Sequence, residues 1–299
     1  MISLKQLHYA LAIEKTLHFK KAADACFVSQ SALSTAINEL EKQLGVTIFE
    51  RNNKQVLVTS RGKLILDKAK RVKVELDQLM QVSQLDKAPF SMPMSIGVIP
   101  TIGPYLLPKV LPEVRRQFPE FKLKIHEEQS HVLVDMVKSG ELDAAILALP
   151  FPIAGLMSFD FWQEDFYWVS HKDEHHSHLQ EITTDEIELE KLMLLKEGHC
   201  LKEHALAACS LKQHTKNNDF DAVSLHTLIQ MVAGKLGTTI VPEMALDQLI
   251  TDDSELVAVH LNEPSPHRTI ALIIRPNYVR TEELIMLNDI FAKQLMIYS

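Results

Sequence analysis

Cysteine is scarce in this chain, with only three in 299 residues, too few for a disulfide framework. In a reducing compartment they remain thiols by default. Long apolar runs are also absent: no stretch of about 18 apolar residues occurs, which argues against a membrane span. The opening residues MISLKQLHYALAIEKTLHF lack the layout of a secretory signal. We therefore expect a cytoplasmic protein without a membrane partner.

Motifs for metal, phosphate and hydrolytic chemistry are lacking as well. The histidine-rich stretch HKDEHHSHL at 171–179 has no ordered ligand spacing and is typical of a polar loop. GKLGTTIVP at 234–242 lacks the glycine spacing of a phosphate loop. No Ser-His-Asp arrangement follows from residue order. The sequence thus predicts no metal, no cofactor and no enzyme.

Charge is unevenly distributed along the chain. Residues 1–90 contain 14 basic and 9 acidic residues, a balance of +5, whereas the whole chain carries −8 and the remainder therefore −13. A basic N-terminal segment on an acidic body suggests a nucleic-acid-binding module joined to a part that need not touch nucleic acid. On charge alone, the alternative is that the uneven distribution arose by chance and does not indicate nucleic-acid binding.

The first 59 residues have the pattern of a winged helix-turn-helix. LKQLHYALAIEKT places apolar residues on one helical face, and HFKKAADACFVSQ gives a second short helix with a small-residue face. Ser29 or Gln30 can start a third helix, which Gly45 ends. Short helices that cross at small residues are typical of a helix-turn-helix. TIFERNNKQVLVTSRG then predicts two strands and a turn, which form a basic wing.

Residues 60–87 predict one long helix, which Thr59 or Ser60 can cap. Its apolar residues follow at alternating intervals of four and three: Ile65, Ala69, Val72, Leu76 and Leu79. Such spacing is a heptad seam of about two heptads. The alternative is that this helix packs within its own domain. Its position between a DNA-binding domain and a larger second domain favours a dimer seam.

After QLDKAPFSMP, the sequence alternates between strand and helix patterns. Strands are predicted at 94–99, 122–127 and 143–148, and helices at about 102–117 and 130–139. This βαβαβ order is typical of an α/β domain with a parallel sheet. A similar alternation resumes later, and the chain ends in an amphipathic helix.

The segment AADACFVSQSALSTAINELEKQLGVTIFERNNKQVLVTSRG and the long helix after it resemble the LysR-type bacterial transcription regulators, and the resemblance covers essentially the whole chain. It implies a multidomain α/β protein with a winged helix-turn-helix at 1–59 and a dimerising linker helix at 60–87. A periplasmic-binding-protein-like regulatory domain follows at 88–299. Its two α/β subdomains are expected at about 88–162 plus 269–299, and at about 163–268.

Several segments are similar to the peroxide-sensing members of that family, among them IGVIPTIGPYLLPKVLP, HEEQSHVL, LLKEGHCLKEHALAAC and PHRTIALIIRP. The similarity implies that Cys200 is the peroxide-reactive thiol and Cys209 its resolving partner. It also implies a peroxide site made of five residues: Thr101, Ser130, His131, His199 and Arg268. Ser130 stands where Thr is usual and keeps the hydroxyl, while Lys202, Glu203 and His204 make the segment more charged than expected.

The same resemblance implies the partners. They are double-stranded promoter or operator DNA, hydrogen peroxide, and further copies of the chain in a homodimer or homotetramer. RNA polymerase is a further candidate. The implied function is a transcription regulator of oxidative-stress genes that is switched by a disulfide.

Physical chemistry supports a reactive Cys200. Gly198 lets the backbone turn and CLKEHALAAC has helix-forming composition, so Cys200 is expected near a helix start, where a thiol pKa falls. Peroxide converts a thiolate to a sulfenic acid, which a second thiol converts to a disulfide. Without the resemblance, small buried hydrophobes are the favoured interpretation of both cysteines, and Cys26 keeps that interpretation.

Helical spacing makes the expected disulfide a switch. Nine helical steps put the Cα atoms of Cys200 and Cys209 roughly 13 Å apart, whereas a disulfide needs them within about 7 Å. The bond therefore requires that the segment be remodelled, which makes it a bistable element.

For DNA, the recognition helix is expected to begin near Gln30. Gln and Asn pair with adenine, and Ser or Thr contact bases or phosphates. Basic residues of the wing suit phosphates or the minor groove. The candidate DNA contacts are Gln30, Ser31, Ser34, Thr35, Asn38, Arg51, Lys54 and Arg61.

Two rival functions are compatible with parts of this pattern. A LysR-type regulator can respond instead to a small molecule bound between the subdomains, in which case a Cys200→Ser protein would behave as before. A thiol peroxidase would turn over steadily with a thiol reductant, but it leaves the first 60 residues unexplained.

Overall fold

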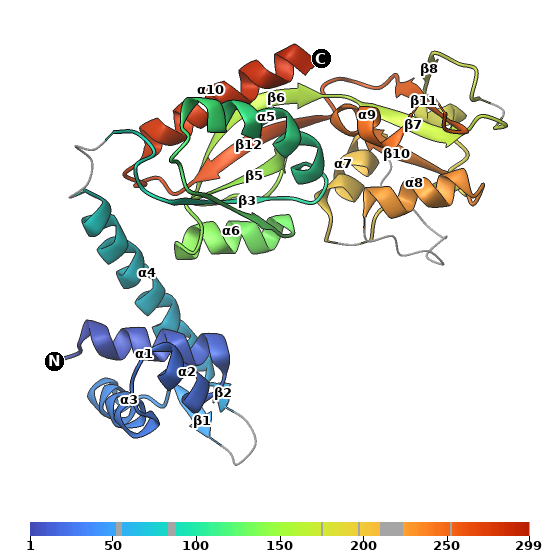
Figure 1. Ribbon diagram of the computed structural model, residues 1–299. Helices are drawn as coiled ribbons and strands as arrows, with labels where there is room; N and C mark the ends of the chain where they lie inside the picture. Colours follow the sequence, from blue (N-terminus) through green and yellow to red (C-terminus); the bar gives the residue numbers. More distant parts are fainter. Residues whose placement is uncertain are drawn as a thin grey trace. The chain divides into compact units, whose positions relative to one another are not determined.

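The computed structural model describes residues 1–51, 56–82, 88–174, 176–196, 198–209, 224–251 and 253–298 (Figure 1). The chain divides into two compact units, Met1–Asp86 and Lys87–Ser299, and each has its own apolar core. Within the described residues, no helix combines the length and apolarity needed to cross a membrane.

Three helices build the core of the first unit. α1 (Leu4–Thr16) starts with a capping box between Ser3 and Gln6, and α2 (Phe19–Ala25) packs on both of its neighbours. α3 (Gln30–Leu44) is capped by Ser29, whose Oγ accepts a hydrogen bond from the backbone N–H of Ala32 at 3.2 Å, and it ends at Gly45 with φ +65°. The predicted start and stop of this helix are both confirmed.

The wing is a two-stranded antiparallel sheet of β1 (Phe49–Arg51) and β2 (Val56–Val58). Glu41 of α3 holds it, because its Oε1 accepts hydrogen bonds from the backbone N–H groups of Ile48 (2.6 Å) and Phe49 (3.0 Å). The predicted strands are confirmed, while the turn at 52–55 lies outside the described residues.

The long helix is α4 (Ser60–Val82), and Thr59 caps it by accepting a hydrogen bond from the Gly62 N–H at 2.8 Å. Part of the expected seam packs against the first unit instead of facing a partner. Ala69 is buried, and Lys70 next to it pairs with Glu14 of α1 at 2.8 Å. Val72 and Leu79 are 40% and 65% exposed, respectively. The first half of the helix therefore packs against its own unit, and a dimer seam along its exposed apolar residues stays a prediction.

The first sheet of the second unit has the strand order β4-β3-β5-β12-β6. The predicted strands are confirmed as the parallel trio β3 (Met94–Val98), β4 (Leu123–Glu127) and β5 (Ala144–Leu149). Two antiparallel strands extend it, β6 (Met157–Glu164) and β12 (Arg268–Ile274). α5 (Gly103–Gln117) and α10 (Thr281–Tyr298) cover one face and α6 (Ser130–Ser139) the other (Figure 1).

The second sheet has the order β8-β11-β7-β10-β9 and mixes parallel with antiparallel pairs. Its strands are β7 (Phe166–His171), β8 (Glu181–Ile182), β9 (Leu192–Met193), β10 (Thr238–Pro242) and β11 (Leu256–Leu261). Its helical elements are η1 (Thr184–Glu186), α7 (Cys200–Ala208), α8 (Leu225–Ala233), η2 (Glu243–Ala245) and α9 (Leu246–Leu249). The chain crosses between the sheets at Asp165 and returns along 262–267.

Candidate functional site

The site lies where the three parallel strands of the first sheet end. β3 leads to Thr101, β4 leads to Ser130 at the first position of α6, and β5 leads to Pro150. Because the carboxyl ends of parallel strands meet at one edge, their loops come together there, and open α/β sheets bind ligands at this edge. Thr101 and Ser130 are both buried.

Helix α7 brings Cys200 to this edge. Gly198 has φ +96°, a backbone conformation that favours glycine, and a Cβ on it would lie 2.7 Å from the side-chain Oε1 of Gln129, the residue before α6. Cys200 is the first residue of α7 and is buried, as is His204 one turn later. The imidazole Nε2 of His204 lies 2.9 Å from the carbonyl oxygen of Pro150, which docks the helix on the strand ends.

Opposing effects act on the thiol of Cys200. Burial raises its pKa and is the largest effect. The Ser130 hydroxyl and the positive charge of Arg268 lower it, and Glu203 raises it. The Ser130 hydroxyl lies close enough to the sulfur to favour the thiolate, and within the described residues it has no other hydrogen-bond partner. The expected low pKa is therefore wrong for this resting state, because desolvation outweighs the helix start and the guanidinium.

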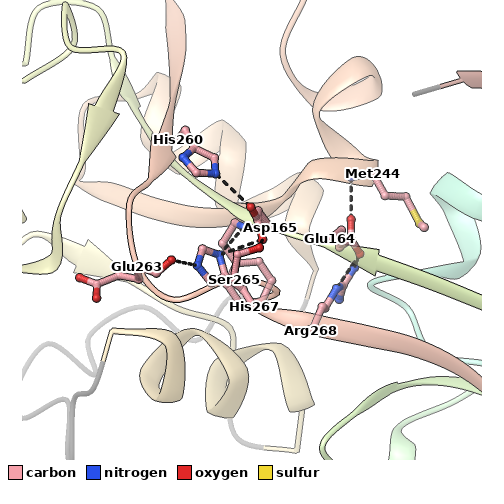
Figure 2. Close-up of polar contacts among 9 residues, drawn as sticks. Glu164, Asp165, Met244, His260, Glu263, Ser265, His267 and Arg268 are labelled. Carbon is pink, nitrogen blue, oxygen red and sulfur yellow. Dashed lines mark hydrogen bonds and ion pairs between the residues drawn. The ribbon is translucent and has the colours of Figure 1, made fainter. Parts of the chain in front are cut away.

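Arg268 brings a buried positive charge to the site. Its side chain is fully buried and pairs with the equally buried Glu164, with Nε and Nη2 at 2.7 and 2.6 Å from Oε1 (Figure 2). The guanidinium also contacts Thr101, where Nη2 donates to the carbonyl oxygen at 3.3 Å and Nη1 to Oγ1 at 3.5 Å. Glu164 also accepts from the Met244 N–H at 2.8 Å. The pair thus joins the first strand-end loop to β6, β12 and η2.

The histidines of the region have different environments. His199 occupies the N-cap position of α7 without a side-chain capping hydrogen bond and is buried, and burial together with Lys196 lowers its pKa. Burial also lowers the pKa of His204, the site histidine that the sequence interpretation did not place here. His131, by contrast, is exposed on α6 and is not buried with the other predicted site residues.

Three buried polar atoms of this cluster lack a hydrogen-bond partner within the described part of the chain. They are Oγ of Ser130, Nε2 of His199 and Nδ1 of His204. Buried polar groups are normally satisfied, so such a concentration beside one thiol calls for an explanation. A small polar molecule with hydrogen-bond donors and acceptors could pair with these three atoms. The described residues contain no group of three or more His, Cys, Asp or Glu side chains that could hold a metal ion, and residue 175 of the histidine-rich loop lies outside them.

Cys209 occupies the opposite end of α7. It is buried and caps the helix, and its backbone N–H donates to the carbonyl oxygen of Ala205 at 3.0 Å. Both cysteines are free thiols. With α7 helical from Cys200 to Ala208, their Cα atoms are separated by roughly nine helical steps, or about 13 Å.

The DNA-binding candidates of α3 share one face of the helix. Gln30, Ser31, Thr35 and Asn38 are exposed and Ser34 is half-buried, whereas Leu33, Ile37 and Leu40 are fully buried on the other face. Arg61 is exposed in the first turn of α4. The side chain of Arg51 and all of Lys54 lie outside the described residues. The half-buried Cys26 lies beside the core of this unit, consistent with a small apolar role.

Comparison with known proteins agrees with this architecture. The chain belongs to the lysR family of bacterial regulatory helix-turn-helix proteins: the model of the family's helix-turn-helix matches residues 4–63, and that of the LysR substrate binding domain matches residues 88–289.

Its relatives include two kinds of regulator. The helix-turn-helix transcriptional regulator EstR of Acinetobacter baylyi is 38% identical over 97% of this chain and 96% of its own. The dual regulator OxyR of Escherichia coli is 35% identical over 92% and 90%. Among solved structures, a full-length OxyR variant from Pseudomonas aeruginosa matches with a TM-score of 0.80 at 33% identity, covering 98% of both chains. A hydrogen-peroxide-bound OxyR variant from Corynebacterium glutamicum matches with a TM-score of 0.66 at 29% identity, covering 99% and 93%.

Proposed function

We propose that the chain is a DNA-binding transcription regulator that senses hydrogen peroxide through Cys200 and Cys209. The observation that carries the proposal is the cluster at the strand ends. One thiol at a helix start is surrounded by a guanidinium and by buried polar atoms of Ser130 and His199 that have no partner in the described structure. Relatives named as hydrogen peroxide-inducible gene activators support it.

In the first step, the Cys200 thiolate attacks one peroxide oxygen. The new S–O bond gives a sulfenic acid, the O–O bond breaks, and the departing hydroxide takes a proton to become water. In this proposal, the Ser130 hydroxyl and the His199 imidazole would hydrogen-bond the peroxide, since both carry buried polar atoms without a partner in the described residues. Arg268 stabilises negative charge on the sulfur and on the departing oxygen. Cysteine supplies both electrons, so no cofactor is required.

In the second step, the Cys209 thiolate attacks the sulfur of the Cys200 sulfenic acid. The S–S bond forms, the S–O bond breaks, and hydroxide leaves as water after taking up a proton. Because helix α7 separates the two residues by about 13 Å, the helix must unwind for the bond to close. Oxidation therefore exchanges one packing of this region for another, and we propose that the change reaches the DNA-binding units through the oligomer.

Further parts of the proposal follow from the family. α3 would read operator DNA with its polar face, while Arg51, Lys54 and Arg61 would contact the backbone. The exposed apolar residues of α4 would contribute to a homodimer, and two dimers would form a tetramer. The regulator would act in the cytoplasm, with RNA polymerase as a further partner and without catalytic turnover. The test is a footprint on the DNA upstream of its own gene: reduced and oxidised protein should protect different lengths, and identical footprints would overturn the redox switch.

The rate of Cys200 oxidation should rise about tenfold per pH unit between about pH 6 and 8. Burial raises the pKa of this thiol, so the reactive thiolate is the minor form throughout that range. Ser130→Ala should slow the reaction about tenfold at each pH, because a hydrogen bond to a charged group is lost. Stopped-flow mixing of the full chain with peroxide measures both, and a rate that levels off below neutral pH would contradict the raised pKa.

Gln30→Ala should weaken binding to the operator by roughly five- to 150-fold, equivalent to the loss of one bidentate base contact. Binding to unrelated DNA should change little, because that binding depends on phosphate contacts. Titration of labelled operator and random duplexes at one salt concentration compares the two. Equal loss on both duplexes would rule out base reading by Gln30.

The match of residues 88–289 to the LysR substrate binding domain leaves one alternative, a LysR-type regulator that responds to a small-molecule effector bound between the two sheets. Such a regulator would keep its response after Cys200→Ser, whereas the proposed sensor would lose it. The same variant therefore separates the two functions.

A further inference from the structure

Phe27 is a large aromatic residue that the first unit leaves in solvent. Its side chain is 95% exposed, although the residues on either side of it, Cys26 and Val28, are half-buried against the core of that unit. A single exposed apolar residue is ordinary on a protein surface. This one, however, also has φ +55°, a left-handed backbone conformation that a bulky side chain rarely adopts.

The backbone of the turn between α2 and α3 fixes this conformation. The Phe27 N–H donates to the carbonyl oxygen of Asp24 at 3.1 Å, and the Val28 N–H donates to that of Ala23 at 3.0 Å. Glycine would adopt the same turn without steric cost, and it would expose no apolar surface. The fold of the unit therefore gives no reason for an aromatic side chain here. Residues held in unfavourable backbone conformations cluster at binding sites, which directs attention to the function of the turn.

Phe27 lies at the end of α3 that approaches DNA in helix-turn-helix proteins. It precedes the N-cap Ser29 by two residues and Gln30 by three, and three residues of chain span at most about 10 Å. Ser29, Gln30 and Ser31 are exposed as well. In this motif, the N-terminal residues of the second helix contact base edges in the major groove. The aromatic ring is therefore next to the side chains that are expected to read bases.

The chemistry of the ring limits what it can recognise there. A phenylalanine side chain neither donates nor accepts a hydrogen bond, whereas the major-groove edges of the bases consist mainly of donors and acceptors. Thymine alone adds an apolar group, its C5-methyl, and contact with phenylalanine removes apolar surface of both partners from water. We propose that Phe27 packs on a thymine methyl group of the operator, beside the base contacted by Gln30. It thereby determines specificity for thymine at one position of the site bound by each α3.

This inference rests on the DNA-binding part of the proposed function and does not depend on the peroxide switch. Deoxyuridine lacks only the methyl group of thymidine, so it tests the contact directly. In the duplex that the full chain protects upstream of its own gene, thymines are replaced one at a time. One replacement for each bound α3 should weaken binding by the parent about three- to fivefold, as expected when one methyl group is no longer buried.

The same replacement should change binding by Phe27→Ala less than about 1.5-fold, because the two partners of one contact are not additive. Phe27→Leu keeps an apolar side chain and should keep part of the discrimination. The matched control is Leu17→Ala. Leu17 is also an exposed apolar residue with positive φ (51% exposed, φ +46°), but it follows α1, and its replacement should leave the parental response to every deoxyuridine. Titration of labelled duplexes at one salt concentration gives the Kd values.

A second variant separates DNA reading from a role in folding. Phe27→Gly should unfold at the parental urea concentration or above it, because glycine relieves the backbone strain, and it should still lose the thymine discrimination. A structural role predicts the reverse, a lower urea midpoint with the parental response to deoxyuridine. That result, or a Phe27→Ala protein that responds to every deoxyuridine as the parent does, would overturn the proposal.

Failure of the proposed function gives different results in the same titrations. A parent that bound the upstream duplex no more tightly than a random duplex would refute DNA reading by α3, and with it this inference. If the parent gave identical footprints when reduced and oxidised, but lost its response to one deoxyuridine in Phe27→Ala, the contact would be supported and the redox switch refuted.

Discussion

Replacing Cys200 by Ser is expected to abolish the response to peroxide. A serine hydroxyl is not a nucleophile at neutral pH without an activating base, so oxidation at this position should slow on the order of a thousandfold or more. No disulfide should then form, and the DNA footprint of the variant should be the same before and after treatment. Thiol titration and footprinting of the same samples check both expectations.

Cys26→Ser is the matched control, because Cys26 is half-buried in the DNA-binding unit and has no part in the proposed switch. This variant should respond to peroxide as the parent does. If Cys200→Ser still changed its footprint with peroxide, or if Cys26→Ser lost the change, the assignment of the sensing thiol would be wrong.

Arg268→Met should destabilise the regulatory unit by about 3–5 kcal/mol. The substitution leaves Glu164 fully buried without the cation that compensates its charge, although the Met244 N–H still donates to it. Loss of the guanidinium also removes an effect that lowers the pKa of Cys200, so oxidation of the folded variant should be slower. Urea unfolding, followed by tryptophan fluorescence, gives the free energy of unfolding.

The double variant Glu164→Gln with Arg268→Met separates the two effects. It buries no charge and should regain most of the lost stability, while its oxidation should stay slow because the guanidinium is still missing. A double variant as unstable as the single one would contradict the ion-pair account, and a double variant with parental oxidation would contradict the role of Arg268 at the sulfur.

Elements with strong local signals could be predicted from the sequence. The recognition helix has its N-cap at Ser29 and its stop at Gly45, so both ends were marked by residues whose local chemistry defines helix ends. The parallel trio was predictable because buried strands of a βαβ unit alternate with amphipathic helices. The helix-forming composition of CLKEHALAAC likewise predicted a helix between Cys200 and Cys209.

Features that depend on distant contacts could not be predicted in this way. The strand β6 went unrecognised because MSFDFWQE mixes charged and aromatic residues, and its partner β12 lies more than a hundred residues later. For the same reason the Glu164–Arg268 pair has no local signature, although two adjacent carboxylates in FWQEDFYW are a signal worth noting. The raised pKa of Cys200 depends on tertiary burial, which a helix start alone does not reveal.

Cys200 and Cys209, which lie at opposite ends of α7, are expected to become joined by a disulfide when peroxide arrives. Peptide mapping by mass spectrometry of the full chain after treatment with one equivalent of peroxide tests it most directly. We predict a Cys200–Cys209 linked peptide as the major product, absent from the reduced sample. Recovery of Cys200 as a sulfinic acid with Cys209 still a free thiol would contradict the claim.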